Sequence, residues 1–264
     1  MAELEREISG HVATLTLNRP ERRNALSLGL IESLTAACHA LRDDTDVRVV
    51  VLRANGRDFS LGIDLTDPAL AAIARLPLGN RRRAMLYGRR VVQAIQALPQ
   101  TTIVAMHGYC LGGGGCLALA CDLRIAASDL RFGMPEVLRG LNMSWGVVPL
   151  LLAQLGPART KELLLTGEPL PAERALAWGL ANRCIEGSEA EAARAAHEWA
   201  AQIATSVPPI AASMIKDTIN AIANAHSAAV HMDADQLLLA QHSADYTEAV
   251  TAFLAKRKPD LTGQ

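Results

Sequence analysis

Aromatic residues are scarce in this chain of 264 residues, where Phe, Trp and Tyr together make up 3%. Proteins that bind single-stranded nucleic acid stack the bases on aromatic side chains, so this scarcity argues against such a function. An excess of charge of one sign is also lacking, because 26 Lys and Arg residues stand against 27 Asp and Glu residues. Without a basic field, nothing general attracts the phosphates of nucleic acid or an anionic membrane. We therefore expect neither nucleic acid nor a membrane among the partners.

Long uncharged apolar runs are missing too, and none reaches the roughly 18 residues that a membrane-spanning helix requires. Residues 1–13 are acidic and polar and lack the apolar centre of a secretory signal. Paired cysteine spacings of the C-x-x-C type are absent, and the number of cysteines is odd. The five are Cys38, Cys110, Cys116, Cys121 and Cys184. This pattern favours reduced thiols, so the sequence predicts a cytoplasmic protein, and we predict no metal site.

What the sequence does contain is enough apolar material for a sizeable core. Hydrophobic residues make up 50% and charged residues 20%, which suits one core or a core with a small helical appendage. Short apolar, β-branched runs are predicted as strands over 12–17, 47–52, 102–106 and 122–126. A helix that Ser27 can cap separates the first two. Strand, helix, strand is typical of an α/β protein with stacked crossovers and a mostly parallel sheet.

After residue 144 the chain is predicted to be helical, apart from an extended piece over 181–185. The expected helices cover 145–155, 157–166, 171–178, 189–205, 208–224 and 228–255, the last with a break near Ser243. Between the strands, residues 66–80 are expected to be irregular, before an amphipathic helix that ends near Leu98.

The most informative stretch runs from Thr102 to Gly140. A buried strand leads into four glycines, Gly112 to Gly115, and then into an apolar helix. Glycines let backbone N–H groups approach a ligand closely, and the first turn of a helix leaves its N–H groups unpaired, so this corner suits a developing negative charge. A fragment of a dinucleotide site is the alternative, with Asp129 loosely placed as its acidic residue. Glu136 follows Pro135 in an apolar setting, where a carboxylate could move protons or simply start a helix.

Three segments carry a resemblance to a known family: HGYCLGGGG at 107–115, CDLRIAASD at 121–129 and FGMPEVLRG at 132–140. Their order resembles the crotonase family, also called the enoyl-CoA hydratase/isomerase family, and the similarity extends over nearly the whole chain. The resemblance implies a ββα spiral core over residues 1–200 and a C-terminal helical region over 201–264 that forms trimers and contacts the nucleotide of CoA. It implies an acyl-CoA thioester substrate, no separate cofactor, and a homotrimer or a hexamer built as a dimer of trimers.

The same resemblance assigns roles to single residues. The backbone N–H groups of Ile63 and Gly113 would form an oxyanion hole for the thioester oxygen, and Glu136 would transfer protons. Arg22, Arg23 and Lys256 are the cations expected to bind CoA, although any of them can equally be a solvated surface charge. Trp145 is expected to line or narrow the acyl pocket. Asp64 and His107 border the two oxyanion loops and are secondary candidates, since such residues more often cap turns or hydrogen bond structurally.

Cys116 is where the sequence departs from the family pattern. Hydratases of the family carry a second glutamate there, and the two carboxylates hold a water between them. A thiol cannot orient a water in this way, whereas one carboxylate suffices to move a double bond from the 3,4 to the 2,3 position. We therefore expect an enoyl-CoA isomerase, with hydratase, thioester hydrolase and a non-catalytic acyl-CoA-binding protein as alternatives. Cys116 itself is expected to line the acyl pocket as a small packed hydrophobe rather than act as a nucleophile.

Overall fold

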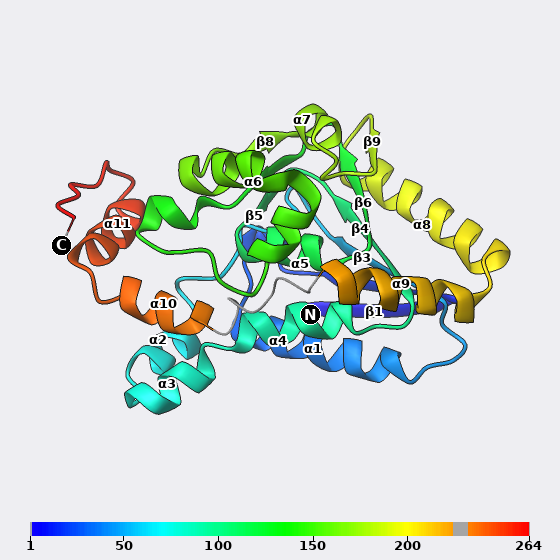
Figure 1. Ribbon diagram of the computed structural model, residues 1–264, viewed down its shortest axis with the longest axis horizontal. Coiled ribbons are helices and arrows are strands. Elements are labelled where there is room, and N and C mark those ends of the chain that lie inside the picture. The colour runs from blue at the N-terminus through cyan, green and yellow to red at the C-terminus, as the bar shows by residue number, and fades with distance from the viewer. Residues whose placement is uncertain (1, 224–231, 264) are drawn as a thin grey trace.

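A twisted six-stranded sheet forms the centre of the protein (Figure 1). The computed structural model describes residues 2–223 and 232–263. The strand order is β1-β2-β3-β4-β6-β9, and every neighbouring pair is parallel except β1 and β2. The strands are β1 (Leu4–Ser9), β2 (Val12–Leu17), β3 (Val49–Ala54), β4 (Thr101–Met106), β6 (Leu123–Ala127) and β9 (Arg183–Ile185). The α/β class predicted from the sequence is confirmed, while β1 was not predicted.

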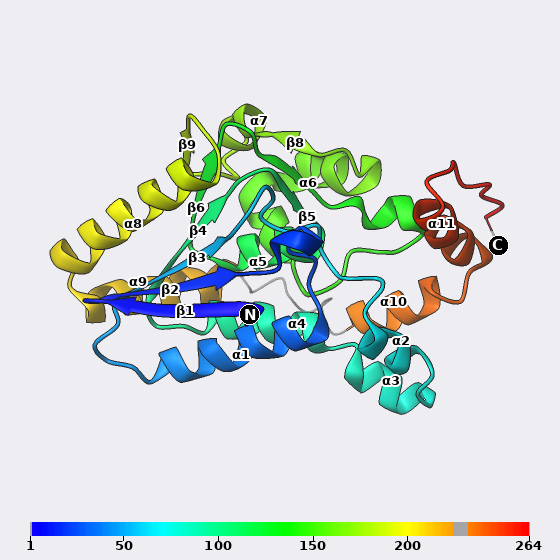
Figure 2. The same cartoon turned by 180° about the vertical axis from the view of Figure 1, so that it is seen from behind.

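The inner strands of this sheet are buried on both faces, and β3, β4 and β6 are accordingly buried at nearly every position, whereas the edge strand β1 is polar and mostly exposed. Along β3, Val50 and Leu52 face the helices α1 (Leu28–Arg42), α4 (Tyr87–Gln96) and α5 (Gly113–Ala120). Val49 and Val51 point the other way and pack against the alanine-rich face of α8 (Glu189–Ser206). Figure 2 shows α8 on the opposite side of the sheet from α1 and α4. The alternation along one strand therefore divides the core into two layers.

A second, small sheet contains the strand that directly precedes the glycine run. It has three strands in the order β5-β7-β8, namely β5 (Tyr109–Leu111), β7 (Arg131–Gly133) and β8 (Leu170–Pro171). β5 leads directly into α5, and β7 leads into the 3-10 helix η2 (Pro135–Arg139). This sheet therefore sets the glycine run and Glu136 side by side.

Local signals fix several helix ends. The hydroxyl of Ser27 accepts a hydrogen bond from Leu30 N at 3.0 Å and caps α1, as predicted. The helix α6 (Val148–Thr166) is broken at Gly156, just before Pro157, where two helices were predicted. Residues 66–80, expected to be irregular, contain α2 (Pro68–Ala74) and the start of α3 (Leu78–Ala84). Asp67 caps α2 by accepting from Ala69 N at 2.8 Å, with Pro68 at the first helical position.

The C-terminal region continues with further helices. They are α7 (Ala172–Ala177), α9 (Pro209–Ala223), α10 (Asp233–Ala240) and α11 (Ala244–Leu254). The helix predicted over 228–255 begins outside the described residues, and its break is present where Ser243 caps α11. The division predicted at residue 200 falls within α8 and stays a prediction. None of the helices described is both long and apolar enough to span a membrane.

Candidate active site

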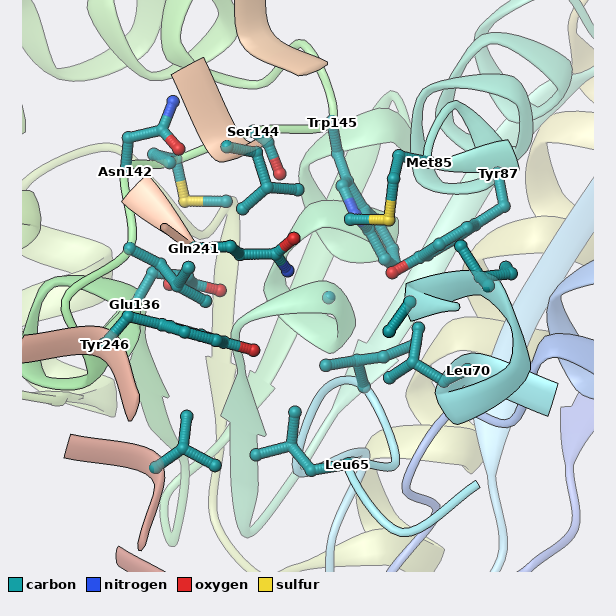
Figure 3. A pocket seen from close by; sticks show the side chains of 18 of the residues that line it. Leu65, Leu70, Met85, Tyr87, Glu136, Asn142, Ser144, Trp145, Gln241 and Tyr246 are labelled. Atoms are coloured by element: carbon teal, nitrogen blue, oxygen red, sulfur yellow. The ribbon is translucent and has the colours of Figure 1, made fainter. Parts of the chain in front are cut away.

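A cavity of about 250 Å³ lies between the glycine run, η2 and the helices α3, α10 and α11 (Figure 3). Five residues that the sequence singled out line it: Ile63, Gly113, Cys116, Glu136 and Trp145. They come from four separate stretches of the chain. The fold therefore brings the predicted oxyanion loops, the carboxylate and the acyl-pocket residues to one place.

The glycine run makes a corner that side chains could not enter. Gly112 has φ +51° and ψ −121°, and α5 begins at the next residue. A Cβ on Gly112 would lie 2.7 Å from Oε1 of Glu136, and a Cβ on Gly114 would lie 2.6 Å from Cβ of Ser60. The Glu136 carboxylate packs against the backbone of Gly112, and the loop over 59–64 packs against the backbone of Gly114. Glycine is therefore required at both positions, because a side chain would prevent this close approach.

Ile63 stands beside this corner on its own loop. A Cβ on Gly62 would lie 3.2 Å from the backbone nitrogen of Gly113, so the two loops touch. Leu26 fixes the outer loop, because its N–H donates to Gly62 O at 2.8 Å and its carbonyl accepts from Asp64 N at 2.9 Å. Within the residues that the structure describes, the N–H groups of Ile63 and Gly113 donate to no protein acceptor. Two free donors in adjacent loops are what an oxyanion hole needs, and that role stays a prediction.

Glu136 occupies the first turn of η2, directly after Pro135. Its Oε2 is fully buried and has no hydrogen-bond partner. Burial raises the pKa of Glu136 to about 7, against smaller opposing effects of a backbone hydrogen bond and of Arg139. A carboxyl group with this pKa exists in both protonation states near neutrality, so it can accept a proton and return it.

Cys116 is fully buried one turn into α5. Burial raises the pKa of its thiol well above the usual value, and the neighbouring Glu136 adds to the effect. The thiol is therefore held neutral, which favours a packed hydrophobe over a nucleophile. In the part of the chain that the structure describes, Glu136 is the one carboxylate that lines the cavity.

Trp145 forms a wall of the cavity. Its indole packs between two glycines, since a Cβ on Gly88 would lie 2.0 Å from Cε2 of the ring and a Cβ on Gly113 would lie 2.7 Å from Cη2. Tyr87 meets the ring edge-on, with 5.8 Å between the ring centroids. The backbone of Trp145 adopts φ +68°, a left-handed conformation that bulky residues rarely take. Packing on two helices holds the indole against this local preference.

Comparison with known proteins decides the family. The sequence profile of the Enoyl-CoA hydratase/isomerase family matches residues 7–264. This chain belongs to that family. The resemblance to the crotonase family is thereby confirmed, and so is the crotonase fold.

Individual relatives of this enoyl-CoA hydratase/isomerase family member carry different activities in their names. The chain is 35% identical over 254 residues to the 1,2-epoxyphenylacetyl-CoA isomerase of Escherichia coli strain K12, covering 96% of this chain and 95% of that protein. It is 32% identical to a probable enoyl-CoA hydratase of Bacillus subtilis, covering 96% of each. Its fold matches the crystal structure of carnitinyl-CoA hydratase from Mycobacterium avium with a TM-score of 0.86, at 31% identity and 99% coverage of each chain.

The secondary candidates of this hydratase/isomerase family member make structural hydrogen bonds. Asp64 lies outside the cavity lining, where it accepts from Thr66 N at 3.1 Å and pairs with Arg19 at 3.2 Å. Burial acts to raise the pKa of Asp64, but the bonds from Thr66 and Arg19 outweigh it and hold the pKa below its usual value. His107 shares a hydrogen bond with Gly56 O at 2.8 Å through Nε2, and burial lowers its pKa. These contacts give each residue a part in shaping the flanking loops.

Two of the cations expected to bind CoA are consecutive residues at the end of one 3-10 helix, and the third lies near the end of the chain. Arg22 closes the 3-10 helix η1 (Pro20–Arg22) and contacts Asp64 and Thr66. Arg23 donates to Asp58 at 2.6 Å and lies over the ring of Tyr109. Lys256 is exposed beyond the end of α11. Their contact with CoA stays a prediction, and the first two already have partners within the chain.

Several cavity residues were not found from the sequence. Arg81 on α3, Gln241 after α10 and Tyr246 on α11 line the cavity, as does Tyr87 beside Gly88. The available signal was weak, since Arg81 belongs to a run of three arginines that also suits a solvated surface. Gly88 within an amphipathic helix was a better signal of close packing, and its partner Trp145 lies 57 positions further on.

Proposed function

We propose that this chain shifts the double bond of a 3-enoyl-CoA thioester to give the 2-enoyl-CoA isomer. The single observation that carries the proposal is Glu136, a lone buried carboxylate with a pKa of about 7 next to two free backbone donors. An isomerisation needs one base and an electrostatic partner for the carbonyl oxygen. Family membership supports acyl-CoA chemistry, and the reaction proposed here is the finer step.

The proposed mechanism uses Glu136 twice. In its ionised form it accepts a proton from C2 of the substrate. The C2–H electron pair forms a C1=C2 bond, the π electrons of the C1=O bond move onto the thioester oxygen, and the C3=C4 bond stays in place in the resulting dienolate. The protonated Glu136 then gives its proton to C4. As the C1=O bond re-forms, the C1=C2 electron pair becomes the C2=C3 bond and the C3=C4 pair bonds the new proton at C4, so the product carries its double bond between C2 and C3. No proton or electron is gained or lost overall, and the proposal calls for no cofactor beyond the CoA of the substrate.

The N–H groups of Ile63 and Gly113 are proposed to bind the thioester oxygen while it carries this charge. A backbone donor fixed by the fold needs no reorganisation when the charge develops, and each such donor lowers the barrier by about 3 kcal/mol. The dipole of α5, whose first residue is Gly113, adds to the same potential.

Hydration of a 2-enoyl-CoA is the second candidate, because relatives named as hydratases match the chain over nearly its full length. It requires Glu136 alone to hold the attacking water, since Cys116 stands where the second carboxylate of hydratases would be. Thioester hydrolysis meets the same difficulty. A protein that binds acyl-CoA without turning it over is the remaining alternative.

One assay separates these candidates. The protein is incubated with a 3-enoyl-CoA and, separately, with a 2-enoyl-CoA, and the products are resolved by chromatography. Isomerase activity predicts conversion of the first substrate only, and Glu136→Gln should lower this rate by about a hundredfold or more. Water addition to the second substrate would establish a hydratase, and release of free CoA a hydrolase. Binding of both thioesters without any product would leave the non-catalytic alternative.

We also propose a cytoplasmic homo-oligomer. All five cysteines are free thiols, in keeping with a reducing compartment. The helix α9 presents a row of exposed apolar side chains: Ile210, Met214, Ile215, Ile219 and Ile222. A contiguous face of this kind is typical of a protein–protein contact, so α9 is proposed to join the subunits of a trimer or hexamer.

A further inference from the structure

The cavity contains a positively charged group that the proposed chemistry does not use. Arg81 lines it from α3, and its Nη2 donates to Oε1 of Gln241 at 2.6 Å. Its Nε is buried and has no hydrogen-bond partner. Among the residues that the structure describes, no carboxylate lies within ion-pair distance of this guanidinium. A buried donor on an unpaired cation is costly unless a ligand completes it.

Two more side chains add donors at the same place. The oxygen of the Gln241 amide is taken by Arg81, so its NH₂ group is left to hydrogen bond with the hydroxyl of Tyr246. Burial raises the pKa of Tyr246, so the phenol keeps its proton. Figure 3 shows the Gln241 amide and the Tyr246 hydroxyl directed into the cavity. The hydroxyl proton of Tyr246 and the free N–H groups of Arg81 can therefore both be donated to a bound group.

This cluster lies on a different part of the cavity wall from the oxyanion donors. Arg81, Gln241 and Tyr246 belong to α3 and the α10–α11 segment, which Figures 1 and 2 place at one end of the long axis of the molecule. α5, which begins at Gly113, lies near the middle. An acyl group with its thioester carbonyl at Gly113 extends its far end toward α3 and the C-terminal helices, since these complete the cavity.

We propose that Arg81, with Gln241 and Tyr246, binds a carboxylate at the far end of the acyl group, so that the preferred substrates are CoA monothioesters of dicarboxylic acids. A carboxylate has two oxygens that match the planar donors of a guanidinium, and a phenol O–H supplies a third bond. A plain alkyl chain would leave the guanidinium of Arg81 without a charged partner in the bound state. The inference rests on the proposed function only in taking an acyl-CoA thioester as the ligand.

Binding of saturated thioesters tests the inference without any turnover. Isothermal titration compares pairs of equal chain length, glutaryl-CoA with pentanoyl-CoA and adipyl-CoA with hexanoyl-CoA. In at least one of the two pairs, the wild-type protein should bind the thioester with the terminal carboxylate about ten- to a hundredfold more tightly than the plain thioester of equal length, because a charged hydrogen-bonded pair is gained. Arg81→Met should remove this preference and leave the affinity for the plain thioester within about threefold.

Two further variants serve as controls. Arg83→Met alters an exposed arginine of the same helix that contacts Asn80, and it should keep the preference. Gln241→Glu sets a carboxylate against Arg81 and should abolish the preference even though the guanidinium remains. Circular dichroism melting checks that each variant is folded.

Equal affinity of the wild-type protein for both members of every pair would overturn the inference and leave the proposed function standing. An Arg81→Met variant that loses affinity equally for both thioesters and for free CoA would also overturn it, because Arg81 would then bind the CoA phosphates. Failure to bind any thioester would overturn the proposed function together with the inference.

Discussion

Glu136 has an environment that makes its charge depend on pH in the neutral range. Its pKa of about 7 follows from burial, which penalises the ionised carboxylate. The base form is the ionised one, so kcat/KM should rise with pH and level off above a midpoint near 7. A pH–rate profile of the 3-enoyl-CoA reaction measures this directly. A midpoint below about pH 5 would show that the free enzyme uses an ordinary, well-solvated carboxylate instead.

The same pKa affects stability. Because the folded pKa is raised from 4.5 to about 7, the folded state binds more protons than the unfolded state between these values. Stability is therefore highest below the lower pKa and falls as pH rises through the higher one, by about 3 kcal/mol in all. Glu136→Gln should lack this loss. Urea unfolding of both proteins at about pH 4 and about pH 8 should show the variant gaining on the wild type at the higher pH. A constant difference would contradict the burial described for Oε2.

Trp145 is expected to limit the size of the acyl group. Trp145→Ala removes the ring that lies on Gly88 and Gly113 and opens the cavity between them. The ratio of kcat/KM for long over short acyl chains should rise about tenfold or more, while thermal unfolding shows a loss of about 3 kcal/mol from the emptied packing. Trp145→Phe retains a ring and should change both quantities less. An unchanged ratio in the Ala variant would place the acyl chain elsewhere.

The sequence predicted which residues meet in the cavity where a motif surrounded them. Ile63, Gly113 and Glu136 lie in short stretches that resemble motifs of the family, and that resemblance assigned them to one site; all three line the cavity. Arg81 could not be found in this way, because its partner Gln241 is 160 positions away and nothing near either residue indicates the other. Whether a polar residue belongs to a binding site depends on which residues the fold places next to it, and those residues can be distant in the sequence.

At the scale of elements, α9 is fastened to the core by one buried cation. Nζ of Lys216 lies 2.8 Å from Oδ2 of Asp122 and donates to Gln100 O at 2.9 Å. Asp122 also accepts from Thr102 N and Thr102 Oγ1, so it joins α9 to the start of β4. Several apolar positions on the outer face of this helix are exposed and do not pack against the core. The contact between Lys216 and Asp122 therefore contributes much of the attachment of α9 to the core.

Lys216→Met should lower the free energy of unfolding by about 3 kcal/mol, since Asp122 would lose its partner in a partly buried site. Denaturant unfolding measures the loss, and hydrogen exchange should show that α9 loses protection before the central strands do. Lys161→Met changes a lysine on the exposed surface of α6 and is the matched control. Equal protection of α9 in the variant and the wild type would contradict this anchoring role.

Elements were predicted well where periodicity and caps agreed, and poorly where they were short. The inner strands β3, β4 and β6 of the central sheet are buried on both faces, so their sequence is distinctive, whereas the polar, exposed edge strand β1 was not predicted. The helices α2 and α3 have seven residues each and no buried side chain, which leaves no apolar stripe to detect. β8 has two residues and exists only because it pairs with β7. Short elements of this kind owe their structure to neighbours rather than to their own pattern.

At the scale of the whole molecule, the apolar face of α9 predicts self-association. Ile219→Lys should convert a particle with the mass of three or six chains of 28.1 kDa into a monomer, because a charge in the centre of such a contact costs several times RT. Light scattering coupled to size exclusion measures the mass. Leu78→Lys, at an exposed apolar residue on α3, is the control and should leave the mass unchanged. A monomeric wild type would contradict the proposal.

The packing of Trp145 between Gly88 and Gly113 also constrains the order in which this protein can accept substitutions at these positions. With the indole in place, any larger residue at Gly88 collides with it, whereas a smaller residue at 145 removes that collision. The order of substitutions therefore matters: position 145 has to shrink first, and only then do changes at 88 become neutral. In laboratory evolution toward bulkier substrates, substitutions at position 145 should therefore precede substitutions at position 88 in each independent experiment.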